Sequence, residues 1–264
     1  MKSTVKAVRE KKGKEKIVAL TAYDYPFARI LDEAGVDIIL VGDSLGMVVL
    51  GYDSTLPVTM REMIHHTKAV SRAVKRALVV GDMPFGSYQI STEHALRSAK
   101  RFIQEGGADA VKLEGGEPVV KTVKTLSRQG IPVMGHLGMT PQTATLLGGY
   151  KVQGREPKAA RKILDDALRL EEAGVFSLVL ECVPHRLAQR ITQKISCPTI
   201  GIGAGPKTDG QILVLHDLLG FVGAVHPRFV RRYAQFENEA RKAFSRYASD
   251  VRSGSFPNLK ESFE

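Results

Sequence analysis

The sequence predicts a single α/β domain, a closed (β/α)8 or TIM barrel. Two observations lead to this prediction. Short apolar runs alternate with helical segments through most of the 264 residues, which implies a parallel sheet with right-handed connections. About eight such units favour a closed barrel over an open doubly wound sheet. In addition, a helix end, a glycine and an apolar strand follow one another repeatedly, at 32–37, 104–109, 127–132 and 171–176.

The boundaries of the elements follow from glycine, proline and capping residues. Pro26 opens a helix and Gly35 ends it, because proline suits a first helical turn and glycine suits the residue after a last one. Thr59 followed by Glu62 predicts a capping box. The expected helices are 26–35, 59–75, 91–107, 117–130, 158–174, a short one from Pro184, and 231–251.

Apolar runs that end in glycine or an acid are typical of strands buried on both faces. The expected strands are 18–23, 38–46, 78–82, 110–116, 132–138, 177–182, 199–205 and an eighth within 220–225. Two long connections, 47–59 and 139–157, have no helical period and are rich in turn residues. Long loops of this kind often carry function.

Composition is that of an ordinary globular protein, with 43% hydrophobic and 25% charged residues. No apolar run approaches the ~20 residues that cross a bilayer, and no secretory signal is visible. The two cysteines, Cys182 and Cys197, do not make a disulfide framework. We therefore expect a cytoplasmic protein without membrane contact. Its single domain spans 1–264, with a short charged arm at about 1–16 and a C-terminal helix and tail at about 231–264.

The formal net charge of +10 does not by itself indicate nucleic-acid binding. Proteins that bind nucleic acids gather lysine and arginine on one face or in one arm. Here the basic residues are spread over many expected helices, where solvated faces account for them. A basic surface could still attract anionic substrates, so we expect small-molecule partners and no nucleic acid.

Charged side chains recur where the expected strands end. They are Asp43, Asp82, Glu114, His136 and Glu181. In a barrel of this class the active site lies at the carboxyl ends of the strands. Strand side chains alternate, so Lys112 points to the same side as Glu114. Gathering four acids is costly unless a cation or protons compensate, so we predict a functional site here rather than four independent helix caps.

The chemistry of these donors favours Mg²⁺, a hard ion that prefers oxygen ligands. Zinc is disfavoured because no cluster of cysteine and histidine has the needed spacing. His136 is either a ligand or a neighbour that holds the ligands in place. The glycines at 201–205 either cradle a phosphate through backbone N–H groups or form a tight turn.

Several long motifs resemble ketopantoate hydroxymethyltransferases. They lie at 41–47, 53–59, 112–116, 135–142, 148–154, 180–184, 201–205 and 208–211. The resemblance extends from about residue 16 to 233 and implies a (β/α)8 barrel with one Mg²⁺ per subunit. It implies transfer of a hydroxymethyl group from 5,10-methylenetetrahydrofolate to 3-methyl-2-oxobutanoate. The product is 2-dehydropantoate, on the way to pantothenate and coenzyme A. A cytoplasmic homo-oligomer, commonly a homodecamer, is implied as well.

The resemblance also implies roles for individual residues. Asp43, Asp82 and Glu114 take the metal positions, and Glu181 takes that of the catalytic base. The substrate positions are Asp43, Ser44, Asp82 and Lys112. Two other interpretations stay open: another Mg²⁺-dependent 2-oxo acid aldolase or lyase of similar barrel fold, and a non-catalytic binding or assembly protein. Dependence on folate would separate the first from a hydroxymethyltransferase, and failure to bind Mg²⁺ would favour the second.

Overall fold

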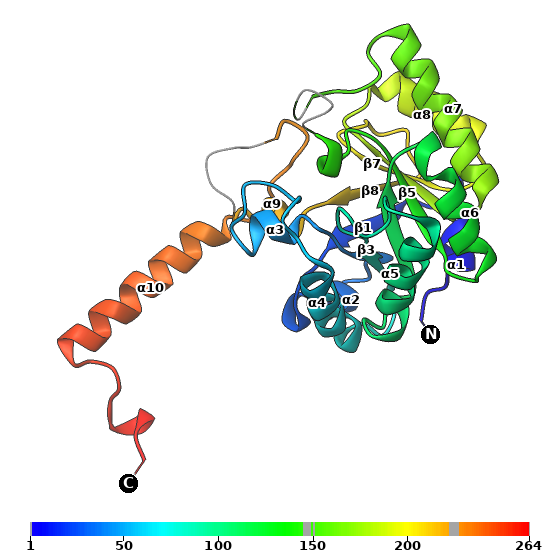
Figure 1. Cartoon of the computed structure of the whole chain (residues 1–264). Helices are drawn as coiled ribbons and strands as arrows, with labels where there is room; N and C mark the ends of the chain where they lie inside the picture. Colours follow the sequence, from blue (N-terminus) through cyan, green and yellow to red (C-terminus); the bar gives the residue numbers. More distant parts are fainter. Residues whose placement is uncertain (1, 145–148, 150, 222–226, 264) are drawn as a thin grey trace. The chain divides into compact units, whose positions relative to one another are not determined.

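The centre of the molecule is a closed barrel of eight parallel strands, which confirms the predicted fold. The computed structural model describes residues 2–144, 149, 151–221 and 227–263. Neighbouring strands pair in chain order and β8 pairs with β1, while the helices that connect the strands lie outside (Figure 1). The strands are β1 Ile17–Thr21, β2 Ile38–Val41, β3 Leu78–Asp82, β4 Ala110–Glu114, β5 Val133–Gly138, β6 Ser177–Glu181, β7 Thr199–Ile202 and β8 Gly210–Leu213.

The chain divides into two compact units, 1–214 and 215–264. The first unit holds the whole barrel together with α1 Val5–Glu10, α2 Tyr25–Glu33, α3 Leu45–Val48, α4 Met60–Ala73, α5 Thr92–Gln104, η1 Glu117–Val119, α6 Val120–Arg128, η2 Pro141–Thr143, α7 Pro157–Ala173 and α8 His185–Lys194. The second unit holds α9 Leu215–Leu219, α10 Phe236–Ser253 and η3 Leu259–Glu261. Within the described ranges, no helix is long and apolar enough to cross a membrane.

The eighth strand lies earlier in the chain than the sequence predicted. It is Gly210–Leu213, whereas the expected strand was within 220–225, of which 222–225 fall outside the described residues. This strand has four residues, of which only the last two, Ile212 and Leu213, are large and apolar, and Ile212 is the one buried in the core. Its place is fixed by pairing: Gly210 lies opposite Ile17 of β1 and Ile200 of β7.

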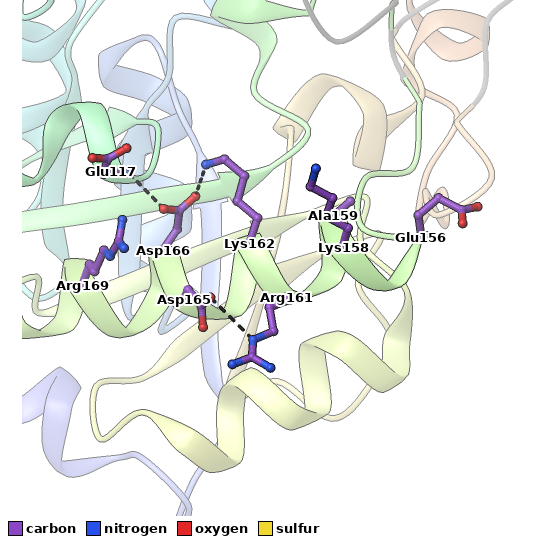
Figure 2. A pocket seen from close by; sticks show the side chains of 9 residues that line it. All are labelled: Glu117, Glu156, Lys158, Ala159, Arg161, Lys162, Asp165, Asp166 and Arg169. Atoms are coloured by element: carbon purple, nitrogen blue, oxygen red, sulfur yellow. Dashed lines mark hydrogen bonds and ion pairs between the residues drawn. The ribbon is translucent and has the colours of Figure 1, made fainter.

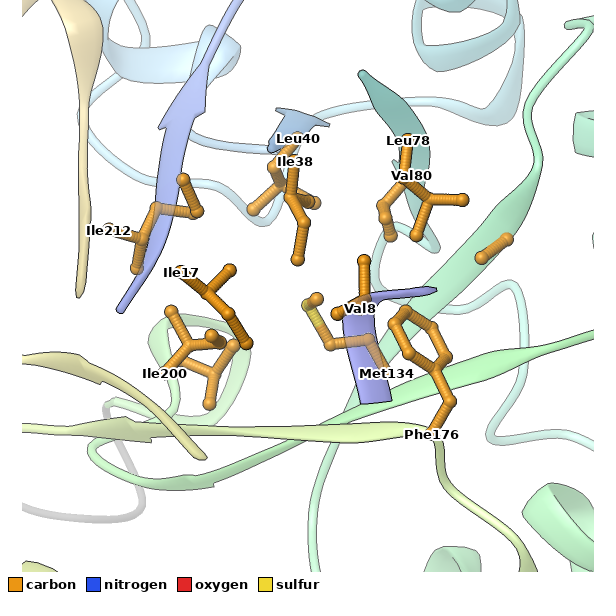
Figure 3. Close-up of a cluster of buried hydrophobic side chains, with 13 residues drawn as sticks. Val8, Ile17, Ile38, Leu40, Leu78, Val80, Met134, Phe176, Ile200 and Ile212 are labelled. Atoms are coloured by element: carbon orange, nitrogen blue, oxygen red, sulfur yellow. The ribbon is translucent and has the colours of Figure 1, made fainter. Parts of the chain in front are cut away.

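The amino-terminal segment contains a helix, although its sequence was expected to form a short arm without helical period. Helix α1 begins after Thr4, whose side chain accepts a hydrogen bond from the backbone N–H of Ala7. Val8 of this helix is fully buried within the hydrophobic core of the barrel. Figure 3 shows it among Leu78, Met134 and Phe176. A few apolar residues among many charges were too weak a signal to predict a helix.

Three aspartates at the amino ends of β2, β4 and β8 bind this segment. Asp37, Asp109 and Asp209 each accept a backbone N–H from the preceding strand, at Val18, Val79 and Thr199 respectively. Each also forms an ion pair with a lysine near the amino terminus. The pairs are Lys11–Asp37 at 2.7 Å, Lys2–Asp109 at 2.6 Å and Lys12–Asp209 at 2.9 Å. Two of these aspartates, Asp37 and Asp109, end copies of the repeat that leads into a strand, so the repeat also supplies residues that hold the amino-terminal segment.

Replacing Val8 by alanine tests how much the packing of α1 contributes to stability. The change removes buried methyl groups and leaves a cavity, so we expect a loss of about 2–3 kcal/mol in the free energy of unfolding. Chemical denaturation followed by circular dichroism measures it. Val18, which is about half exposed, provides the matched control, and Val18→Ala should cost less than about 1 kcal/mol. Equal losses in both variants would contradict a role of α1 in the core.

Asp32, at the end of α2, holds the turn between α4 and β3. It is buried and its two carboxylate oxygens accept the backbone N–H groups of Lys75, Arg76 and Ala77 at 2.7–3.2 Å. Burial alone would raise the pKa of Asp32, but these hydrogen bonds outweigh burial and lower it. The ionised form is therefore the one that the fold stabilises.

We expect Asp32→Ala to lower the free energy of unfolding by about 2–4 kcal/mol at neutral pH, because it leaves three buried or partly buried backbone N–H groups without their acceptor. The pKa of Asp32 is lower in the folded than in the unfolded chain. Its contribution to the free energy of unfolding is therefore complete at a pH above the unfolded-state pKa, and it disappears as the pH falls through the folded-state pKa. The difference in free energy of unfolding between wild type and Asp32→Ala should therefore become smaller below about pH 4. Denaturation curves from pH 7 to pH 3 measure it, with the exposed Glu33→Gln as control.

Candidate active site

Strand register brings the predicted site residues to one end of the barrel. Asp82, the last residue of β3, lies opposite Lys112 of β4, and Glu114, the last of β4, lies opposite His136 of β5. Glu181 ends β6. Asp43 lies two residues after the end of β2, and its backbone N–H lies 3.3 Å from an Asp82 oxygen. The parallel pairing therefore collects side chains from five consecutive strands.

Lys112 is the positive centre of the group. Its Nζ donates to both oxygens of Asp82 at 2.7 and 2.9 Å, and to Glu114 Oε1 at 3.4 Å. The side chains of all three residues are at most 5% exposed. Burial opposes the charged form of Lys112, but the carboxylates of Asp82, Glu114 and Asp43 raise its pKa above the ordinary value. Lys112 is therefore an ammonium at neutral pH.

The three buried carboxylates differ in how well they are compensated. Burial, together with the charges of Asp82 and Glu114, raises the pKa of Asp43 well above its ordinary value. Burial also raises the pKa of Asp82, even though Lys112 opposes the rise. For Glu114 burial acts in the same direction, but Lys112 and His136 outweigh it and lower the pKa. Negative charge is thus least compensated around Asp43.

His136 connects Glu114 to Glu181. Its Nδ1 lies 3.3 Å from Glu114 Oε1 and its Nε2 lies 3.3 Å from Glu181 Oε2, and neither contact is a well-directed hydrogen bond. Burial and Lys112 lower the pKa of His136, but the two carboxylates outweigh them and raise it to about 9. The Glu181 side chain is 13% exposed, more than its buried neighbours. Glu181 is therefore the carboxylate of this group with the best access from outside.

The remaining predicted residue, Ser44, lies at the rim of this group. It follows Asp43 and precedes α3, and it makes no side-chain capping bond. Its Oγ lies 2.9 Å from the hydroxyl of Tyr23, which is buried just after β1. The hydroxyl of Tyr23 thus holds Ser44 next to the carboxylate group.

Comparison with known families gives one decisive match. Residues 2–259 match the model of a family described as ketopantoate hydroxymethyltransferase. The chain belongs to this family. It is therefore an enzyme, a transferase, as the sequence predicted.

Ketopantoate hydroxymethyltransferases with similar sequences come from several bacteria. The chain is 58% identical over 261 residues to the 3-methyl-2-oxobutanoate hydroxymethyltransferase of Thermoanaerobacter sp. (strain X514), covering 99% of this chain and 95% of the relative. It is 56% identical over 263 residues to an enzyme of that name from Thermus thermophilus, covering 100% of both. The relative from Moorella thermoacetica is 60% identical over 250 residues, with 95% and 93% covered.

Solved structures with the same fold are much less similar in sequence. Phosphoenolpyruvate phosphomutase from Streptomyces platensis subsp. rosaceus matches with a TM-score of 0.62 at 14% identity, covering 95% of this chain and 88% of that one. A 2,3-dimethylmalate lyase matches with a TM-score of 0.59 at 16% identity, covering 100% and 92%. These likenesses concern the fold of the hydroxymethyltransferase barrel alone.

The donor set at the strand ends fits a divalent cation. Four carboxylates face one ammonium and one imidazolium, so the group carries an excess of two negative charges when every member is ionised. Oxygen donors of this kind suit Mg²⁺. In this structure the Lys112 ammonium contacts both Asp82 and Glu114. As they stand, no three acidic, histidine or cysteine side chains among the described residues converge on a metal site, so the fit to Mg²⁺ concerns the chemistry of the donors rather than their present geometry.

Two glycines allow the chain to pass close to site residues. A Cβ on Gly138 would lie 2.1 Å from the carbonyl oxygen of Glu181, so glycine is required where β5 ends beside β6. A Cβ on Gly116 would lie 2.2 Å from an oxygen of Asp166. Asp166 accepts the backbone N–H of Glu117 at 3.0 Å and thereby holds the turn after Glu114 (Figure 2).

Two glycines of the segment 201–205 are also in close contact with neighbouring side chains. Gly201 lies against Thr208 and Gly205 lies against His185, so close packing accounts for glycine at both positions.

Asp166 also lines a surface groove of about 660 Å³ along α7, drawn in Figure 2. The groove contains none of the strand-end residues. Two of its cations already pair within the helix, Arg161 with Asp165 and Lys162 with Asp166. The groove therefore has mixed charge and adds nothing to the strand-end site.

Sequence reasoning did not identify two polar residues that contact the carboxylates, Gln142 and Tyr88. Gln142 lies in η2 after β5, and its side chain contacts Asp43. Tyr88 lies after β3, and its hydroxyl contacts the backbone of Glu114. Gln142 belongs to a motif that resembles the family, and this was the available signal. No sequence pattern pointed to Tyr88, because a single tyrosine in a loop does not indicate which residue it will contact.

Proposed function

We propose that this hydroxymethyltransferase moves a one-carbon unit from 5,10-methylenetetrahydrofolate to 3-methyl-2-oxobutanoate. The product would be 2-dehydropantoate, a precursor of pantothenate and coenzyme A. The observation that supports this most directly is the group of Asp43, Asp82, Glu114 and Lys112 beside the more accessible Glu181. Such a site can hold a 2-oxo acid by its charges and present a base to its carbon chain.

We propose that Asp43, Asp82 and Glu114 hold one Mg²⁺ per subunit. Their charge and oxygen donors support this assignment, as does the raised pKa of Asp43, because a cation would supply the compensation that this carboxylate lacks. Bound there, Mg²⁺ would act as a Lewis acid that stabilises the enolate of the 2-oxo acid. Asp43 and Asp82 would also contact the substrate, as the resemblance to the family implies.

The other residues have roles that follow from charge and access. The Lys112 ammonium and the Ser44 hydroxyl would bind the carboxylate of the substrate and orient it. Glu181 would take the proton from C3, and the ion pair with His136 would hold it in position. The electron pair left at C3 would then form a bond to the methylene carbon of the folate. Both carbon–nitrogen bonds that hold this methylene carbon to the folate would break, and water would supply the oxygen of the new hydroxyl group. The two released nitrogens would take up one proton from C3 and one from water.

Assembly and location complete the proposal. We propose a homo-oligomer, specifically a homodecamer, that acts in the cytoplasm on small molecules without nucleic acid or a membrane. Family membership supports a biosynthetic role. Two free cysteines agree with a reducing compartment. Light scattering of the purified protein measures the assembly directly.

Proton NMR of 3-methyl-2-oxobutanoate in deuterated water tests the first half of the reaction. We expect loss of the C3 proton signal with protein and Mg²⁺ present, before any folate is added. The signal should persist without the metal ion. Absence of exchange with Mg²⁺, followed by absence of product after addition of methylenetetrahydrofolate, would contradict the proposed function.

A Mg²⁺-dependent aldolase or lyase is the second candidate, because a 2,3-dimethylmalate lyase shares the fold at a TM-score of 0.59. Both candidates predict exchange of the C3 proton. Only a hydroxymethyltransferase needs methylenetetrahydrofolate to form 2-dehydropantoate. Formation of a new carbon–carbon bond or cleavage of one without folate would therefore favour the lyase.

A further inference from the structure

Gln142 is buried between the loops that carry the carboxylates. It is 3% exposed, and it uses both its backbone and its side chain as hydrogen-bond donors. The backbone N–H donates to Glu114 Oε2 at 3.1 Å. The side-chain Nε2 donates to Asp43 Oδ2 and to the carbonyl of Met83, both at 2.9 Å. Gln142, four residues beyond the end of β5, is thereby bonded to the segments after β2 and β3 and to the last residue of β4.

The orientation of the Gln142 amide is fixed by its four side-chain partners. The Oε1 atom accepts from the Tyr88 hydroxyl at 2.7 Å and from Gln89 Nε2 at 3.3 Å. If the amide were flipped, its oxygen would face the Asp43 carboxylate, so that two acceptors met. Its NH2 group would face Gln89 Nε2, so that two donors met. Asp43 therefore always meets a donor, which favours one position of its carboxylate.

Tyr88 extends the same network to Glu114. Its hydroxyl is buried, donates to Gln142 and accepts the backbone N–H of Glu114 at 3.2 Å. Burial, with the charge of Glu114, raises the pKa of Tyr88 above its ordinary value, so the hydroxyl keeps its proton at all physiological pH values. Glu114 is thus held on its side chain by Gln142 and on its backbone by Tyr88.

We propose that Gln142, supported by Tyr88, is a positioning residue that sets the affinity of the site for a divalent cation. It contacts Asp43 and Glu114 at once, and these two carboxylates come from strands that do not pair with each other. Neighbours that orient metal-binding carboxylates typically change metal affinity 10- to 100-fold when they are lost. The inference rests on the proposed Mg²⁺ site and names the residue that orders it.

Replacing Gln142 by methionine keeps the length of the side chain and removes its side-chain hydrogen bonds, including the one to Asp43. The backbone N–H that donates to Glu114 remains. Gln153→Met is the matched control, because Gln153 lies in the same loop and its side chain bonds only to the Lys151 carbonyl among described residues. Mn²⁺ binding to each purified protein is measured by electron paramagnetic resonance. We expect Gln142→Met to raise the Kd for Mn²⁺ at least about tenfold. Gln153→Met should leave the Kd unchanged.

Two further measurements separate positioning from a general loss of structure. Tyr88→Phe should raise the Kd for Mn²⁺ as well, and the double variant should raise it by less than the product of the single effects, because both act through one network. At saturating Mg²⁺, C3 proton exchange by Gln142→Met should return to nearly the wild-type rate. Equal Mn²⁺ affinity in wild type and Gln142→Met would overturn this inference alone. Absence of Mn²⁺ binding to wild type would overturn the proposed metal site together with the inference.

Discussion

Glu181→Gln is expected to bind Mg²⁺ and 3-methyl-2-oxobutanoate but to exchange the C3 proton about 10²–10⁴-fold more slowly than wild type. The amide has nearly the shape of the carboxylate, yet it cannot accept the proton. Glu181 is more exposed than the buried acids and contacts His136 rather than Lys112. Loss of its charge should therefore affect the proton transfer more than the binding of either ligand.

The rate is measured by proton NMR in deuterated water at saturating Mg²⁺, and binding is measured by calorimetry. Glu172→Gln, an exposed substitution of the same kind on α7, provides the control and should exchange at the wild-type rate. If Glu181→Gln exchanged as fast as this control, another group would have to be the base. If the variant lost Mg²⁺ binding instead, Glu181 would belong to the metal ligands.

Lys112→Met should lower the free energy of unfolding by about 3–5 kcal/mol when no divalent cation is present, because buried charges lose their partner. The ammonium forms ion pairs with Asp82 and Glu114 inside the barrel. A divalent cation supplies positive charge to the same carboxylates. At 100 times its Kd, a cation that binds only the folded protein would restore about 2.7 kcal/mol.

Denaturant unfolding with and without Mg²⁺ measures both effects at one protein concentration. Lys124→Met, on the exposed side of α6, is the control and should show little change under either condition. Binding of 3-methyl-2-oxobutanoate should be weaker in Lys112→Met even when Mg²⁺ is saturating. A variant as stable as wild type would show that the carboxylates are protonated rather than paired.

Local sequence signals predicted most of the elements that build the site. The capping box of Thr59 and Glu62 is present at the start of α4. Ser91 caps α5, and the predicted start of α2 is confirmed by the proline in its first turn. These signals work because they involve residues three or four positions apart. Acids at the ends of apolar strands were equally visible, because parallel strands in a barrel end on one side.

What the sequence did not reveal depends on contacts between distant segments. β8 is defined by its pairing with β7 and β1 rather than by an apolar run. The contact between Gln142 and Asp43 joins residues 99 positions apart. Such contacts follow from register and loop placement, which no local pattern encodes. The roles of the site residues came from resemblance to the family, whereas their proximity came from the fold.

The binding of α1 at the amino ends of the strands has a consequence for the order of folding. Lys12 is made early in synthesis, yet its partner Asp209 lies 197 positions later, just before β8. The first helix therefore cannot complete its contacts until nearly the whole barrel has left the ribosome. Contacts of such sequence separation slow folding and leave intermediates exposed. Until β8 emerges, the growing chain is an open sheet with unpaired edges at β1, so chaperones would meet it in that form.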